Sequence, residues 1–120
     1  MSWIVVAALS GAIGVVAGAF GSHALRTRLA PEMASAWDTA VLYHLLHSAV
    51  LLAIAFYGVL GERPVRLPAG LFAAGIALFC GSLYLITLTG WRALGPVTPL
   101  GGLCLIAGWI SLLTLARPAS

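Results

Sequence analysis

Charged residues are scarce in this sequence. Of its 120 residues, 8% are Asp, Glu, Lys or Arg and 62% are hydrophobic, whereas soluble domains carry roughly 25% charged residues. This composition excludes an ordinary soluble domain. The chain has no lysine, and its six arginines are scattered, for a net charge of +3. Because no basic cluster with interleaved aromatic residues is present, nucleic-acid binding is excluded, and we expect the arginines to contact lipid headgroups.

Cysteines and catalytic motifs are also few. Cys80 and Cys104 both lie inside apolar runs, unlike the loop cysteines of a disulfide framework, and are predicted to be small buried hydrophobic residues. Ser82 lies in no G-x-S-x-G motif, and no carboxylate lies deep in an apolar run to orient a histidine or to complete a hard metal site. The sequence therefore favours a protein without enzymatic activity, and no metal site is predicted.

Long apolar runs are what the chain does contain. A membrane-spanning helix needs about 20 apolar residues, and four runs of suitable length cover about 3–25, 31–60, 67–88 and 98–116. Ala17-Gly18-Ala19 resembles a signal-peptide cleavage site, but no basic residue precedes the first run and the run is too long. We predict one all-α integral membrane domain, a four-helix bundle with up-down-up-down topology.

The ends of the predicted helices carry familiar signals. Pro31 is placed as the first-turn proline of the second helix, and Thr98 and Pro99 are placed as the N-cap and first residue of the fourth. Gly14 and Gly18 have the G-x-x-x-G spacing that lets helix backbones approach closely. The arginines do not predict orientation, because they divide equally between the two sides: Arg26, Arg28 and Arg92 against Arg63, Arg66 and Arg117.

The second run is organised around Tyr43-His44-Leu45-Leu46-His47-Ser48. At about 100° per residue, one face is predicted to carry Trp37, Ala40, His44, His47, Ser48, Leu51, Ala55 and Gly58, with Tyr43 at its edge. The opposite face carries Leu42, Leu45, Ala49, Leu52, Ala53, Phe56 and Leu60. In lipid, the small and polar face must turn toward protein, and ionisable side chains at such depth are candidates for function.

Alternating helix directions bring most of the polar groups to one half of the bundle, at the connections after the first and third helices. We predict a polar half-cavity there, opening toward those connections. Its candidate binding residues are His23, Trp37, Tyr43, His44, His47, Ser82, Tyr84 and Thr98, with Arg26 and Arg92 at the rim.

The histidines admit three interpretations. His44 and His47 are three residues apart and so are neighbours on the helix surface. In the favoured interpretation each ring hydrogen-bonds across helices; in the second, the rings bind a ligand such as an anionic lipid headgroup. In the third, they hold a metal ion or a haem.

Four strings of the sequence resemble one family. They are Gly18–Leu25 (GAFGSHAL), Tyr43–His47 (YHLLH), Leu78–Tyr84 (LFCGSLY), and Thr98–Gly102 with Ala107–Trp109 (TPLGG and AGW). Together they are similar to the YgdD-like small inner-membrane proteins, a family of unknown function with a eukaryotic transmembrane relative. At His44 the chain departs from the family pattern, in which a Gln resembles the usual occupant.

The resemblance implies a four-span protein of the bacterial inner (plasma) membrane and supplies no activity, substrate or cofactor. We favour a small binding protein or accessory membrane subunit whose polar half-cavity holds a lipid headgroup, a quinone or another amphiphile. Its expected partners are membrane lipids and a second copy or a membrane protein. The alternatives are a haem-binding or metal-binding redox protein or enzyme, and a small oligomeric transporter.

Overall fold

A computed structural model describes residues 2–116 of the chain. Arg117, one of the six arginines compared above, lies outside the described residues. The elements, in chain order, are α1 (Trp3–Phe20), a π-helical turn (Gly21–Leu25), α2 (Pro31–Leu60), α3 (Arg66–Gly75), a second π-helical turn (Ile76–Cys80), α4 (Gly81–Thr89), a 3₁₀ turn (Arg92–Leu94), α5 (Val97–Ser111) and a final 3₁₀ segment (Leu112–Ala116).

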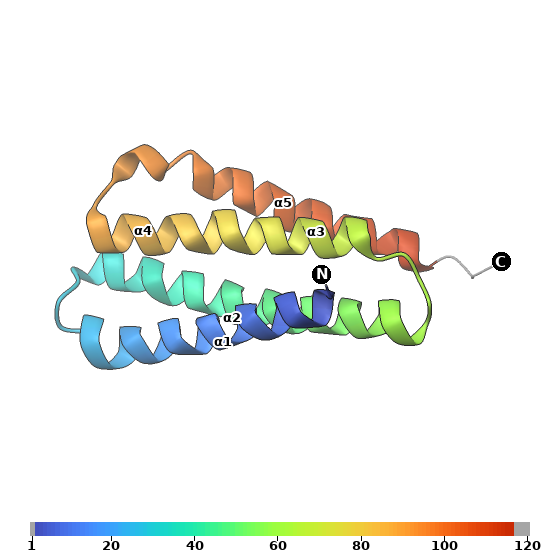
Figure 1. Ribbon diagram of the computed structural model, residues 1–120. Helices are drawn as coiled ribbons and strands as arrows, with labels where there is room; N and C mark the ends of the chain where they lie inside the picture. Colours follow the sequence, from blue (N-terminus) through green and yellow to red (C-terminus); the bar gives the residue numbers. More distant parts are fainter. Residues whose placement is uncertain (1, 117–120) are drawn as a thin grey trace.

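These elements join into four long helices, each long and apolar enough to cross a membrane: Trp3–Leu25, Pro31–Leu60, Arg66–Thr89 and Arg92–Ala116. They pack side by side in antiparallel order in a bundle of 54 × 26 × 20 Å (Figure 1). The all-α four-helix bundle predicted from the apolar runs is confirmed.

The helices α2 and α3–α4 form the middle of the bundle. Figure 1 shows α1 along α2 on one side and α5 along α3–α4 on the other. The connections after α1 and α4 lie at one end, and the connection between α2 and α3 lies at the opposite end. The middle pair therefore has two flanks, one covered by α1 and one by α5.

The burial of α2 follows the predicted division of its faces. Its buried residues are Trp37, Ala40, His44, His47, Ser48, Leu51, Ile54 and Ala55, and Gly58 is half-buried. The leucines, alanines and Phe56 of the opposite face are all exposed. The small and polar face turns inward and the oily face outward, as expected for a helix in lipid.

Glycines let α1 lie close to α2. A Cβ added to Gly14 would lie 2.8 Å from Leu45 Cδ2, and one added to Gly18 would lie 3.2 Å from Val41 Cγ1. Both distances are short for carbon–carbon contacts, which favour about 3.5–4.0 Å. The G-x-x-x-G pair is thus a packing element, as its spacing predicted.

Glycines also close the contact between α3–α4 and α5, which we call the seam. A Cβ on Gly75 would lie 2.5 Å from Leu105 Cδ2, and one on Gly108 would lie 3.3 Å from the Phe72 ring. A Cβ on Gly101 would collide with the backbone of Phe79, in the second π-helical turn. At Gly101 and Phe79, the backbones of the two helices therefore lie in direct contact.

The two π-helical turns coincide with contacts between helices. Such turns are rare and occur frequently at functional sites. Ala17 lies just before the first turn, and its carbonyl accepts the Nε1 hydrogen of Trp37 at 2.9 Å. Just after the second, Ser82 donates to the Phe79 carbonyl at 3.0 Å and shares a 2.6 Å hydrogen bond with Thr98 on α5. The turns thus accompany the bonds that tie α1 to α2 and α4 to α5.

Candidate functional site

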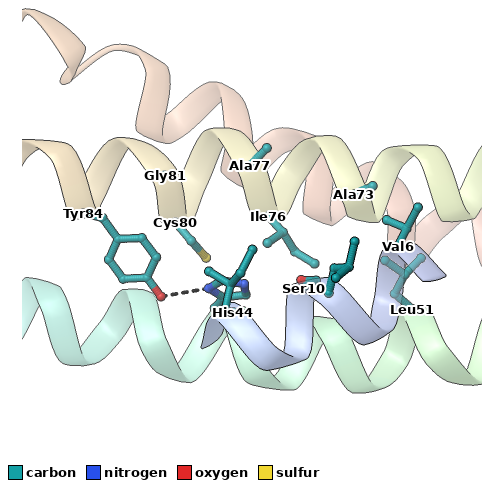
Figure 2. Close-up of a pocket in the computed structure, with 12 residues that line it drawn as sticks. Val6, Ser10, His44, Leu51, Ala73, Ile76, Ala77, Cys80, Gly81 and Tyr84 are labelled. Atoms are coloured by element: carbon teal, nitrogen blue, oxygen red, sulfur yellow. Dashed lines mark hydrogen bonds between the residues drawn. The ribbon is translucent and has the colours of Figure 1, made fainter. Parts of the chain in front are cut away.

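A cavity of about 470 Å³ lies between α1, α2 and the helix formed by α3 and α4. We call it the groove; Figure 2 shows its lining. Most of its wall is apolar, and it includes Val6, Leu9, Ile13, Leu51, Ile76 and Ala77. The polar atoms come from Ser10, His44, Cys80 and Tyr84. The groove is therefore an apolar channel with a small polar patch.

His44 and Tyr84 form the centre of the polar patch. The tyrosine hydroxyl, from α4, lies 2.9 Å from His44 Nδ1, and Figure 2 shows the bond crossing between the two helices. His44 is buried, at 5% exposure. The Tyr84 ring packs on Trp37, with centroids 4.6 Å apart. Trp37 is itself bonded to α1, so the patch is held by three helices.

The serines of the site are engaged with each other. Ser48 donates to the His44 carbonyl at 2.6 Å, and the Ser10 hydroxyl lies 2.6 Å from that of Ser48. Because the single hydrogen of Ser48 goes to the carbonyl, Ser10 is the donor in the bond between them. These bonds fasten α1 to α2 beside His44, and they leave His44 and Tyr84 as the main polar groups available to a ligand.

His47 faces away from the groove. Its Nδ1 lies 2.8 Å from the Tyr43 carbonyl, and its Nε2 lies 3.1 Å from Nε1 of Trp109, on α5. The indole nitrogen can only donate and the carbonyl can only accept, so the ring carries its hydrogen on Nδ1. Both nitrogens of His47 are thus committed to fixed partners.

The two histidines therefore do not form a shared ligand set. His44 points toward Tyr84, and His47 points toward Trp109 and the Phe72 ring, whose centroid is 5.7 Å away. Within residues 2–116, no group of three or more His, Cys, Asp or Glu side chains is placed to hold a metal ion.

The other predicted binding residues are dispersed. Tyr43 is 40% exposed, with its ring 4.8 Å from that of Phe79. Ser82 and Thr98 bond to each other and join α4 to α5. Of the predicted set, only His44 and Tyr84 line the groove, and Trp37 supports them from behind.

The rim residues lie outside the groove. Arg26 and Arg92 are exposed, and so is His23, which lies in the first π-helical turn. His23 was assigned to the site because it lies near the end of the first helix, and it is exposed there. The groove is lined by mid-helix residues, among them the exposed Leu9 and Ile13. The groove is open on the side of Leu9 and Ile13, and a separate, much smaller pocket at the α1–α2 connection is lined by Arg26 and Trp37 among others.

Sequence reasoning missed two residues that line the groove, Ser10 and Cys80, and it missed Trp109 as the partner of His47. Ser10 is the only hydroxyl in α1, which was a usable signal. Trp109 is a tryptophan inside an apolar run, and an indole N–H in such a place needs an acceptor. Cys80 lies in the second π-helical turn, and its sequence context gave no signal beyond burial.

Comparison with known proteins gives a consistent set of relatives. Residues 17–102 match the family described as "Protein of unknown function (DUF423)". The chain is 36% identical over 116 residues to the UPF0382 membrane protein YwdK of Bacillus subtilis, covering 95% of this chain and 94% of that protein. It is 37% identical over 111 residues to a UPF0382 membrane protein of Staphylococcus aureus, with coverages of 92% and 91%.

A fungal relative is equally similar. The chain is 38% identical over 114 residues to a UPF0382 membrane protein of Schizosaccharomyces pombe, covering 90% of this chain and 95% of that protein. No solved structure matches the chain. The groove and its polar patch are therefore interpreted from their own geometry.

Proposed function

The chain belongs to the DUF423 family of UPF0382 membrane proteins, and from this premise we propose that it binds a small amphiphile inside the membrane, without enzymatic activity. It is a multi-pass membrane protein with four long apolar helices, and the resemblance predicted from its four sequence strings is confirmed. The proposed ligand lies in the groove, with its polar group at His44 and Tyr84.

The groove is the single observation that carries this proposal. Pockets for small molecules typically enclose about 300–1,000 Å³ and combine apolar walls with a few placed polar groups. The groove has a volume of about 470 Å³, apolar walls and one buried histidine–tyrosine pair. An apolar tail is accommodated by the walls and a polar head by the pair.

The commitment of His47 argues against a haem or metal function. To ligate a metal, His47 would have to give up the Trp109 bond at Nε2 or the Tyr43 bond at Nδ1. Loss of the Nε2 bond would leave the indole N–H of Trp109 without its acceptor among apolar groups, at a cost of about 1–3 kcal/mol. The bond is better explained as a tie between α2 and α5.

We further propose that the protein resides in the bacterial inner (plasma) membrane, with membrane lipids as its main partners. Its outward side chains support lipid contact, since large apolar residues such as Val16, Leu60 and Leu113 are exposed. A Cβ added to Gly11 or Gly70 would meet open space, which leaves room for the close approach of a helix from a second copy or a membrane partner.

Native mass spectrometry of protein purified in mild detergent tests the proposal. We expect a reproducible bound mass that is lost in Ala77→Leu, because the added side chain fills the groove. Ala74→Leu is the matched control: Ala74 lies one turn earlier on α3, is also exposed and does not line the groove. A wild-type protein without a bound mass, or equal occupancy in both variants, would contradict the proposal.

A further inference from the structure

We propose that the ligand of the groove is a lipid quinone, held through its ring oxygen by Tyr84 and His44 in both the oxidised and the reduced form. This rests on the proposed function and specifies its ligand. Three features of the groove carry the inference: its lack of charge, the chemistry of the histidine–tyrosine pair, and its shape.

The lining of the groove contains no acidic or basic side chain other than His44. The described arginines are found elsewhere: Arg26, Arg28, Arg66 and Arg92 are exposed near the helix ends, and Arg63 bonds Tyr57. A charged headgroup would therefore lie at mid-helix depth without a partner of opposite charge, which is strongly unfavourable. The groove selects a neutral headgroup, contrary to the anionic headgroup that the sequence suggested.

The bond between His44 Nδ1 and the Tyr84 hydroxyl admits two hydrogen arrangements. If Nδ1 is bare, Tyr84 donates to it, and the phenol oxygen is left to accept a hydrogen bond. If Nδ1 carries the hydrogen, it donates to Tyr84, and the phenol O–H is left to donate. The pair can thus donate to a quinone carbonyl or accept from a quinol hydroxyl, and it remains neutral in both cases.

The shape of the groove fits one head and one tail. The polar patch is at one end, and the wall continues along α2 from His44 to Leu51, a distance of about 10 Å at 1.5 Å rise per residue. Tyr84 places an aromatic ring in the wall at the polar end, held from behind by Trp37, which suits a flat ring. The exposed residues Leu9 and Ile13 mark the open side, through which a longer tail continues into the lipid.

The test measures binding of decylubiquinone, oxidised and reduced, to the intact protein in mild detergent. We expect both forms to bind the wild type and Ala74→Leu, and to lose at least tenfold in affinity in Ala77→Leu. Tyr84→Phe keeps the ring and removes the hydroxyl, and we expect an affinity loss of about fivefold or more from the missing hydrogen bond. His44→Leu removes the partner that positions the Tyr84 hydroxyl, and we expect an affinity loss of about fivefold or more for both forms.

Two further probes separate this inference from the proposed function. Dodecyl phosphate carries a charge, and dioctanoylglycerol carries ester carbonyls on two tails. If either probe binds the wild type more tightly than decylubiquinone does, and loses affinity in Ala77→Leu, the groove binds amphiphiles and the quinone assignment is wrong. If no probe binds the wild type in a way that Ala77→Leu abolishes, both proposals fail. Decylubiquinone affinity unchanged in Tyr84→Phe also overturns the role of the pair.

Discussion

The two flanks of the middle helices differ in how well they are filled. On the α1 flank, Ala73, Ala77 and Gly81 follow one another at four-residue intervals along the wall of the groove. On the α5 flank, Phe72 fills the space over Gly108, and Leu105 fills that over Gly75. The same helix, α3–α4, thus presents small side chains to a cavity on one side and a close-packed seam on the other.

The histidines of α2 show what this difference means. His44 faces the groove, where one of its nitrogens takes part in a bond with two possible hydrogen arrangements. His47, three residues later, faces α5, where both nitrogens have fixed roles. Residue type and depth are nearly the same, so the neighbouring helix decides whether a histidine is available to a ligand or serves as a tie.

The largest expected effect is at the seam. Gly101→Ala places a methyl group against the backbone of Phe79, which cannot rotate away, so we expect a loss of about 3 kcal/mol in the free energy of unfolding. Gly81→Ala is the matched control on the groove side, where a Cβ meets open space. That change should be neutral or stabilise by up to about 1 kcal/mol.

Thermal unfolding in mild detergent, followed by circular dichroism, measures both glycine variants. Equal melting temperatures for Gly101→Ala and Gly81→Ala would show that the two flanks are packed alike and would remove the basis of the comparison.

The next effect is smaller and concerns His47. His47→Leu leaves the indole N–H of Trp109 and the Tyr43 carbonyl without their partner, and we expect a loss of about 2 kcal/mol. Cys104→Ala, at a half-buried position on α5, should cost about 1 kcal/mol or less. A double-mutant cycle with Trp109→Phe isolates the bond, and strictly additive losses would contradict it.

The smallest stability effect is expected for His44. His44→Leu removes the bond to Tyr84 but leaves the hydroxyl beside an open cavity, so we expect a loss of about 1 kcal/mol. Its effect on occupancy should be larger, with the bound mass reduced in native spectra. A variant that is less stable than His47→Leu but retains its ligand would reverse the assignment of the two histidines.

The sequence predicted the fold class and the buried face of α2 because both depend on local pattern. Four apolar runs define four helices, and the position of His44, His47 and Ser48 on one face follows from helical geometry alone. The close contact at Gly14 and Gly18 followed from their spacing in the same way.

The arrangement of the site depended on features that a regular pattern does not contain. Two π-helical turns change the angular register of α1 and α3–α4: the exposed His23 lies in the first, and Cys80, which lines the groove, lies in the second. Which helix lies next to each histidine, α1 beside His44 and α5 beside His47, is decided by how the helices pack and cannot be read from a helical pattern. The predicted binding residues accordingly lie in several places: His44 and Tyr84 line the groove, Ser82 and Thr98 join α4 to α5, and His47 bonds Trp109.

Because the groove opens sideways, its occupancy would depend on the composition of the surrounding membrane. Under the proposed function, a ligand would enter between α1 and α3–α4 by diffusion within the plane of the bilayer and would not have to dissolve in water. Its binding constant is then expressed as a mole fraction among lipids, and solubility in the aqueous phase has no bearing on it. Occupancy of the groove would accordingly follow the lipid composition of the membrane, and dilution of the cell suspension would leave it unchanged.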